Sequence, residues 1–153
     1  IGRAAVSAIF RDADRSDESA ERRARSPVAS ALFKLWGVTS LADLARTGNS
    51  IPPPDFAVLF PAVAASSDSL AEQVLSNAGR ELAQVAAVVI RRLFAKDQSA
   101  SVPVAMTGGV FRHASRVRQS FYNELRSLYP QAEVNSQVVE PVEGALRLAR
   151  RAV

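Results

Sequence analysis

The chain has no cysteine among its 153 residues and only two lysines, Lys34 and Lys96. The absence of cysteine excludes disulfides, thiolate metal clusters and a cysteine nucleophile. No apolar run approaches the roughly 20 residues that span a bilayer, so we expect no membrane partner. A chain of this length can bury a hydrophobic core without a disulfide or a metal. The composition therefore predicts an ordinary folded domain.

Arginine supplies almost all of the positive charge, and the formal net charge is +4. Many arginines fall where helices are expected to end, where a cation complements the helix dipole. A noncatalytic helical interaction or nucleic-acid-binding module is the alternative function that this surplus allows. Such modules interleave aromatic side chains with basic ones. Here Phe111, Phe121 and Tyr122 fit a helix core better, so no nucleic acid partner is expected.

Helical patterns dominate the first part of the chain. Apolar spacing predicts a helix to about residue 10, followed by a charged, Ser-rich stretch over 11–25 that forms a loop or a weak continuation of the helix. Capping signals then predict three more helices: from Ser26-Pro27 to Gly37, from Thr39-Ser40 to Gly48, and from Asp55, after the prolines at 52–54.

The longest predicted helix follows Ser69 and Glu72, which match a capping box. Apolar residues at steps of three or four predict its buried face over roughly six turns. They are Leu70, Val74, Ala78, Leu82, Val85, Val89 and Leu93.

The pattern changes over the last third to strand, glycine turn, helix, strand, helix. The predicted strands are 102–106 and Ala132 to Val139, and the predicted helices are Ser115 to Leu128 and Val142 to Arg151. Two parallel strands cannot make a sheet whose faces and edges are all covered. We therefore expect further strands to come from residues before Ile1 or from another chain.

A glycine pair, Gly108-Gly109, closes the first predicted strand and leads into a helix. Glycine has no Cβ, so the backbone there can approach a ligand closely, and ligands of open α/β sheets bind at the carboxyl ends of strands. A tight turn without a ligand explains the pair about as well. The local pattern by itself leaves both interpretations open.

Longer motifs favour the ligand-binding interpretation. Residues 104–111 and 140–149 resemble the C-terminal signature of the BadF/BadG/BcrA/BcrD ATPase family, which includes N-acetylglucosamine kinases. Residues 55–63, 67–71 and 78–82 resemble the helical insertion of that family, and residues 1–5 resemble the helix after its glycine-rich turn. The resemblance covers nearly the whole chain, and each motif is moderately specific.

The resemblance implies a helix-rich α/β fold: an incomplete RNase H-like second lobe of an actin-like ATPase, spanning residues 1–153. It implies a helical insertion at 26–66 and a nucleotide-side core at 102–153. In this family the glycine turn packs beside the adenosine of ATP, so Gly108 and Gly109 would contact the nucleotide. Flanking residues Thr107 and Val110 would lie beside it, and Phe56 and Ala57 would close the other side of the base.

The resemblance also implies a cytoplasmic ATP-dependent sugar kinase. Such a transferase uses Mg²⁺ and moves a phosphoryl group from ATP to a hydroxyl of an amino sugar such as N-acetylglucosamine. The phosphate loops of the family and its catalytic Asp lie upstream of the match. This chain therefore contains no catalytic residue of that reaction and is expected to bind nucleotide without turning it over alone. The implied partners are the upstream lobe and a second copy in a homodimer. Iron-sulfur activators in the family use Cys ligands, and their absence here favours the kinase branch.

The remaining candidates are interpreted as structural. His113 has no second ligand at metal spacing. Arg112, Arg116 and Arg118 could reach phosphate, but a solvated helix face explains them better. Gly144, in the last helix, is expected to allow close packing against the first strand.

Overall fold

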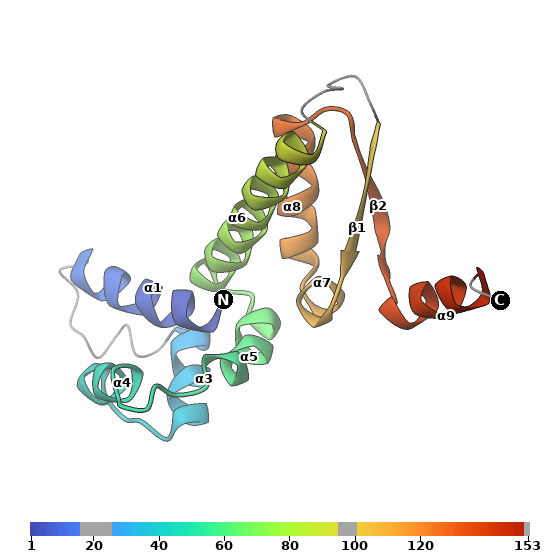
Figure 1. The fold of residues 1–153 in the computed structure, drawn as a ribbon. Helices are drawn as coiled ribbons and strands as arrows, with labels where there is room; N and C mark the ends of the chain where they lie inside the picture. The colour runs from blue at the N-terminus through green and yellow to red at the C-terminus, as the bar shows by residue number, and fades with distance from the viewer. Residues whose placement is uncertain (16–25, 95–100, 152–153) are drawn as a thin grey trace. The chain divides into compact units, whose positions relative to one another are not determined.

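The computed structural model describes residues 1–15, 26–94 and 101–151. The chain divides into two compact units, Ile1–Leu75 and Ser76–Val153. Unit 1 contains α1 (Gly2–Arg15), α3 (Pro27–Trp36), α4 (Leu41–Gly48), η1 (Phe56–Leu59), α5 (Phe60–Ala65) and the start of α6 (Ser69–Leu93). Unit 2 contains the rest of α6, then β1 (Val102–Thr107), α7 (Gly109–His113), α8 (Ser115–Leu128), β2 (Ala132–Val139) and α9 (Pro141–Arg151) (Figure 1).

Unit 1 is a cluster of short helices around an aliphatic core. Every element of the unit contributes to that core, whose fully buried members include Ala5, Val28, Leu32, Leu44, Leu59 and Val63. Helix α1 approaches η1 closely at Gly2, where an added Cβ would lie 2.0 Å from the Phe56 carbonyl oxygen. Only glycine fits there, because any side chain would collide with backbone.

The capping signals of unit 1 act as the sequence predicts. Ser26 accepts a hydrogen bond from the backbone N–H of Ala29, and Pro27 occupies the first turn of α3. The helix ends at Gly37, whose φ of 64° lies in the left-handed region. Ser40 caps α4 in the same way as Ser26 caps α3. The predicted starts of both helices are confirmed.

Unit 2 has a two-stranded parallel sheet, as expected for an α/β chain. The pairing runs from Val102 opposite Ala132 to Thr107 opposite Val139, with an irregularity between Val104 and Met106. The predicted strand at 132–139 and the predicted helix at 115–128 are confirmed to the residue. Helix α7, between β1 and α8, was not expected from the sequence.

The core of unit 2 lies where α6 and α8 pack beside one face of the sheet. It consists of Ala83, Ala87, Ile90, Val102, Met106, Phe121, Leu125, Tyr129 and Ala132. Gly79 of α6 lies against α8 so closely that an added Cβ would be 2.5 Å from the Val117 carbonyl oxygen. Small residues on this face of α6 therefore set the distance between the two helices.

The predicted buried face of α6 is wrong over its C-terminal half. Leu82, Val85, Val89 and Leu93 are 41%, 63%, 49% and 74% exposed. Helix α8 instead packs on the adjacent face, where small side chains let it approach. The helix has two neighbouring apolar faces, and periodicity cannot tell which one a partner covers.

The predicted cap of α6 is one residue too late. Asp68, and not Ser69, accepts a hydrogen bond from the backbone N–H of Ala71 at 2.8 Å. Asp68 and Ser69 are both residue types that cap helices well, and in the structure the Asp68 carboxylate is the acceptor.

Helix α9 does not pack as the sequence predicts. Every residue whose side chain is described in it is exposed, and no atom lies within 4 Å of a Cβ added at Gly144. The expected contact of Gly144 with the β1 strand is therefore absent.

No single helix among the described residues is long and apolar enough to cross a membrane. Helices α3 and α4 together have the required length and composition, but they are bent by 57°. Their residues Val28, Leu32 and Leu44 are fully buried in unit 1.

Candidate functional site

The turn after β1 is open and has an unusual backbone. Gly108 has a φ of 94° and precedes the first residue of α7. Both Gly108 and Gly109 are exposed, and no atom lies within 4 Å of a Cβ added at either. A side chain at Gly108 would be strained by the backbone and would occupy the free space. The turn thus presents bare main chain to solvent.

The turn lies at the carboxyl end of a parallel strand pair. Thr107 Oγ1 donates a hydrogen bond to the Val139 carbonyl oxygen at 3.0 Å, which ties the end of β1 to the end of β2. Glu140, the next residue, precedes α9. The two strand ends therefore meet beside the glycine pair, in the position where open α/β sheets bind ligands.

Helix α7 is held in place by arginine side chains. Arg118 Nη1 donates to the carbonyl oxygens of Phe111 and Arg112, the latter at 3.1 Å. Arg112 Nη2 donates to Glu140 Oε1 at 2.6 Å. These contacts give both arginines a structural role. The sequence interpretation of a solvated helix face is therefore incomplete, because Arg118 is half-buried against the carbonyl oxygens of α7.

A hydrophobic contact completes the support of the turn. The Phe111 ring lies edge-on to Phe121, with 5.2 Å between the ring centroids. Phe121 belongs to the core of unit 2. The glycine turn is consequently flanked by a strand on one side and by a short, anchored helix on the other, which fixes its main chain without covering it.

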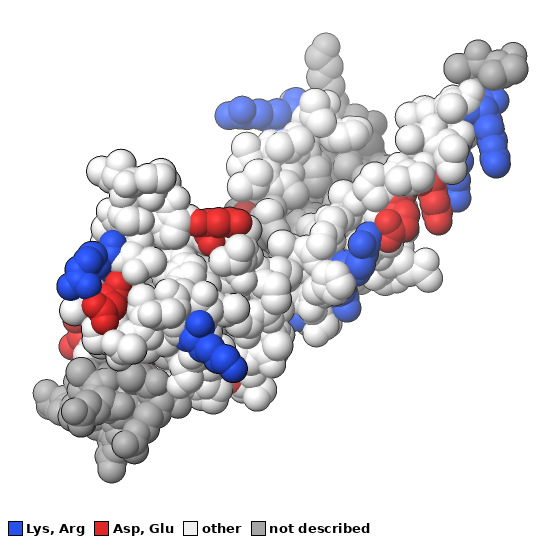
Figure 2. Space-filling model, turned by 90° about the horizontal axis from the view of Figure 1, so that it is seen from below, with Lys and Arg blue, Asp and Glu red and all other residues white. Residues whose placement is uncertain are grey.

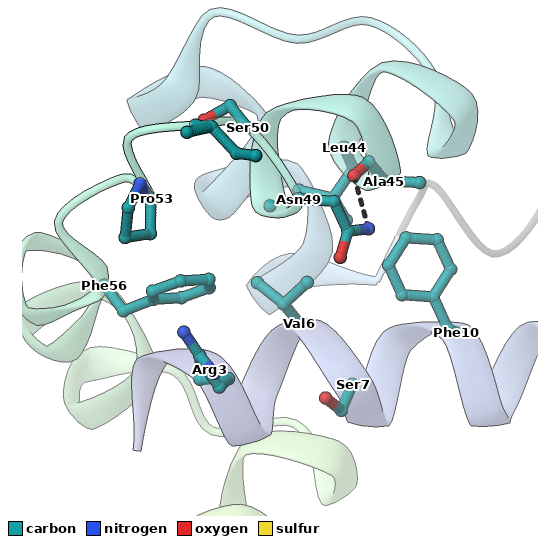
Figure 3. A pocket seen from close by; sticks show the side chains of 12 residues that line it. Arg3, Val6, Ser7, Phe10, Leu44, Ala45, Asn49, Ser50, Pro53 and Phe56 are labelled. Atoms are coloured by element: carbon teal, nitrogen blue, oxygen red, sulfur yellow. Dashed lines mark hydrogen bonds between the residues drawn. The ribbon is translucent and has the colours of Figure 1, made fainter.

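Unit 1 contains a surface pocket of about 460 Å³, shown in Figure 3. This volume is in the range of small-molecule sites. It is lined by Arg3, Val6, Ser7, Phe10, Leu44, Ala45, Gly48, Asn49, Ser50, Ile51, Pro53 and Phe56. Helix α1 forms its floor in this view, while the end of α4 and the segment before η1 form the other walls.

Phe56 is one wall of this pocket. Its ring is half-buried and lies edge-on to Trp36 at 5.2 Å between centroids, and the guanidinium carbon of Arg3 lies 4.7 Å from the Phe56 centroid. Asn49 Nδ2 donates to the Ala45 carbonyl oxygen at 2.8 Å. In Figure 3 the Asn49 side chain reaches toward Val6. The pocket thus combines a fixed aromatic ring with a few polar groups.

The residues predicted for the nucleotide fall into two groups. Thr107, Gly108, Gly109 and Val110 form the turn in unit 2, where Val110 is half-buried and the other three are exposed. Phe56 and Ala57 begin η1 in unit 1, and Ala57 is exposed and donates its backbone N–H to Asp55. Each group is locally consistent with a contact site. Their joint role stays a prediction.

The sequence did not indicate the other pocket residues. Phe10 and Asn49 come from a helix face and a helix end that carry no motif of their own, and Arg3 belongs to the motif at residues 1–5, to which the sequence assigned no site role. Asn49 follows Gly48 at the C-terminus of α4, which reads as a helix stop. Only the packing of α1 against α4 brings these residues together.

His113 lies at the end of α7 and is exposed. Within the described ranges, no group of three or more His, Cys, Asp or Glu side chains could hold a metal ion. The interpretation of His113 as a surface residue is compatible with its position.

On the face seen in Figure 2, Lys and Arg side chains lie close to Asp and Glu side chains at several places. Nucleic-acid-binding domains typically gather basic residues on one face or along one helix. The alternative function stays a prediction.

The chain matches no family model, and no curated protein or solved structure is detectably similar to it. The kinase-family assignment therefore depends on the motif resemblance alone. The helix-rich chain with a parallel two-stranded sheet is compatible with an α/β fold.

Proposed function

We propose that this chain is the adenosine-binding part of an ATP-dependent sugar kinase with an RNase H-like, actin-type fold. One observation carries the proposal: Gly108 and Gly109 expose bare main chain at the carboxyl end of a parallel strand. Such strand ends are the usual ligand sites of open α/β sheets. The motif resemblance supplies the identity of the ligand.

The chemistry of the turn suits a nucleoside. An adenine or ribose face packs best against flat surfaces with few polar groups that fix its orientation. Bare glycine main chain offers that surface, and the hydrogen bond from Thr107 and the anchored helix α7 hold it still. Because the turn is already ordered, binding would lose little conformational entropy.

The resemblance assigns Phe56, in unit 1, to the other side of the base. Its ring is immobilised by Trp36 and by Arg3, and half of it remains accessible at the pocket. A fixed aromatic ring can stack on a purine at low entropic cost. Ala57, next to it, is small enough to leave the ring uncovered.

Phosphoryl transfer needs groups that this chain does not supply. The reaction requires the terminal phosphate and Mg²⁺ to be positioned against the sugar hydroxyl. We assign that role to the upstream lobe, as the resemblance implies, and assign only nucleotide binding to the 153-residue chain. The sugar, N-acetylglucosamine or a related amino sugar, would bind to the complete protein.

Isothermal titration of the chain with ATP tests the proposal. We expect Gly108→Val to weaken binding at least about tenfold, because the new side chain fills the open turn and strains its backbone. Gly37→Val is the matched control, since Gly37 also has a positive φ and open space where a Cβ would lie, but it is at the end of α3. Equal ATP affinities for the wild type and Gly108→Val would contradict the proposal.

A second measurement separates the proposal from the nucleic-acid alternative. Binding of a mixed-sequence DNA or RNA oligonucleotide would weaken steeply with salt if arginines neutralised phosphates. We expect ATP to bind and the oligonucleotide not to bind at physiological salt. Salt-dependent oligonucleotide binding without ATP binding would reverse the assignment.

A further inference from the structure

The parallel sheet of unit 2 has a free edge along β2. The carbonyl oxygen of Gln131, just before β2, points toward β1 and accepts from the Val102 N–H at 3.1 Å. Backbone groups of successive strand residues point to opposite edges, so the N–H and C=O of Val134 point away from β1. No described segment pairs with that side of β2. Such an edge can accept an extended peptide as a further strand.

A groove lies between α8 and β2. It consists of two hollows of about 520 Å³ and about 290 Å³, and Tyr122 of α8 lines both of them. Arg126 of α8 and Val134 of β2 line the larger hollow. Arg118 of α8 and Ser136 of β2 line the smaller one. The α8 side of the groove thus presents an arginine, a tyrosine and a second arginine in succession.

The two arginines make the α8 side of the groove positive. Arg126 Nη1 donates to the Tyr122 hydroxyl at 2.9 Å, and the Arg126 guanidinium carbon lies 5.6 Å from the Tyr122 ring centroid. Among the described residues, Arg126 forms no ion pair with a carboxylate. Arg118 uses Nη1 on the backbone of α7, which leaves its other N–H donors for a second partner.

Glu133 also lines the larger hollow. Side chains alternate between the faces of a strand, and Ala132 and Val134 on either side of Glu133 are the less exposed residues. Glu133 therefore belongs to the face of the sheet opposite α8. A strand added to this edge would meet positive charge on the α8 face and negative charge on the opposite face.

The spacing along α8 matches that of an extended chain. Arg126, Tyr122 and Arg118 are four residues apart in turn, which separates neighbours by about 6 Å along the helix axis. Alternate side chains of a strand lie on one face, roughly 6.6 Å apart. One strand can therefore place three alternate side chains opposite these three residues.

The register of the sheet becomes irregular after Val134, where four residues of β2 span the same length as two of β1. Extra residues of this kind end regular pairing at an edge. Backbone hydrogen bonds to an added strand are therefore expected at Val134, and side chains supply the contact beside Arg118.

We propose that the groove between α8 and β2 binds an extended peptide that adds a strand at Val134 and carries acidic residues four positions apart. Its two carboxylates meet Arg126 and Arg118, and the side chain midway between them packs on Tyr122. The free edge of β1 stays available for the further strands expected from the sequence. The inference does not depend on the proposed nucleotide function.

Isothermal titration with the peptide Thr-Val-Glu-Lys-Val-Lys-Glu-Val-Thr, blocked at both ends, tests the proposal. This sequence reads the same in both directions, so parallel and antiparallel pairing present the same side chains. Its net charge is zero, so the +4 charge of the chain does not attract it as a whole. We expect a dissociation constant below about 1 mM.

The control peptide exchanges the Glu and Lys residues, giving Thr-Val-Lys-Glu-Val-Glu-Lys-Val-Thr. It has the same composition, but its carboxylates are two positions apart. We expect it to bind at least about tenfold more weakly, because it cannot reach both arginines from one face. Equal affinities for the two peptides would overturn the inference.

A charge reversal in the chain tests the direct contact. Arg126→Glu should weaken the first peptide at least about tenfold, and replacing one Glu of that peptide by Lys should restore most of the affinity. Arg116→Glu is the matched control, since Arg116 is exposed on α8 and lines neither hollow. Circular dichroism should show equal helix content. Equal losses for the two variants, or no rescue by the Lys peptide, would contradict the proposed contact.

Hydrogen exchange at the Val134 N–H tests the free edge. This amide should exchange rapidly in the chain alone and at least about tenfold more slowly with saturating peptide. A peptide N-methylated from its third to its seventh residue should not bind, because it cannot pair as a strand. Protection of Val134 without peptide would show that this chain or a second copy already covers the edge. That result, or no peptide binding at about 1 mM, would overturn the proposal.

Discussion

The carboxylate of Asp68 accepts a hydrogen bond from the backbone N–H of Val28 at 2.9 Å, across 40 residues of sequence. Its other oxygen accepts from the backbone N–H of Ala71 at 2.8 Å, at the start of α6. At the same end of α3, the Ser26 side chain accepts a hydrogen bond from the backbone N–H of Ala29. One side chain thus completes the N-terminus of α3 and begins α6, which joins two helices of unit 1.

Asp68→Ala should destabilise unit 1 by about 1–3 kcal/mol, because it leaves two partly buried backbone donors without their acceptor. Urea unfolding followed by circular dichroism measures the loss. Asp55→Ala is the comparison, since Asp55 is exposed and accepts one backbone hydrogen bond, from Ala57. Its effect should be smaller, and equal losses for the two variants would argue against a linking role for Asp68.

Gly79→Ala should destabilise unit 2 although alanine favours helices. The added Cβ would lie 2.5 Å from the Val117 carbonyl oxygen and 2.9 Å from the Phe121 backbone nitrogen, so α8 must move. Overpacking of this kind costs about 1–3 kcal/mol and outweighs the roughly 1 kcal/mol gain in helix propensity. Thermal unfolding measures the balance.

Gly144→Ala is the control for Gly79→Ala, because the space around Gly144 is open. It should leave unfolding unchanged or raise the helix content of α9 slightly. Should Gly79→Ala prove as stable as the wild type, the close contact of α6 with α8 would be in doubt.

Leu125→Ala should lower the free energy of unfolding by about 2–5 kcal/mol, because Leu125 is fully buried in the core of unit 2. Leu148→Ala in α9 removes the same atoms from a side chain that is 68% exposed. The free energy of unfolding of that variant should lie within about 0.5 kcal/mol of the wild-type value. Chemical denaturation of both variants distinguishes a packed α8 from an unpacked α9, and similar losses would show that α9 is buried in solution.

Acid should remove a small contribution that Asp43, in α4, makes to the stability of the folded chain. Hydrogen bonds from Ser40, Arg46 and Thr39 lower the pKa of Asp43 below its usual value of 3.8. Because folding lowers this pKa, the carboxylate stabilises the folded chain above pH 3.8 and loses that effect as the pH falls through the lowered folded value. The effect should be slight, since the Arg46 partner is 77% exposed.

Thermal midpoints of the wild type and Asp43→Asn measure this contribution. The wild type should be the more stable at neutral pH, and the two midpoints should converge in acid. A difference that persists at a pH well below the lowered pKa would show that Asp43 acts through its shape and not through its charge.

Local signals predicted the elements of this chain well. Ser26, Gly37 and Ser40 mark helix ends through hydrogen bonds and backbone preferences that depend only on near neighbours. The sequence pattern also predicted the strand at 132–139 and the glycine turn at 108 and 109. Helix α7 was missed because five residues are too few for a periodic pattern.

Predictions of burial were weaker. Leu82 and Val89 were predicted to be buried, but Ala83 and Ala87 face α8 instead, because Gly79 and these small residues allow the closer approach. The pocket beside Phe56 was likewise invisible, since Arg3 and Asn49 lie far apart in the sequence and converge only when α1 packs on α4.

The amino-acid sequence alone determined where most of the helices and strands begin, because caps, prolines and glycines act over a few residues. It also placed an open glycine pair after the first strand. Only the tertiary structure decided which apolar faces are covered, which acceptor completes the N-terminus of α3, and which side of α6 stays free. Those outcomes depend on how well surfaces from distant parts of the chain fit together. The fit is set by side-chain volumes and by how closely two backbones can approach, and no local sequence pattern contains that information.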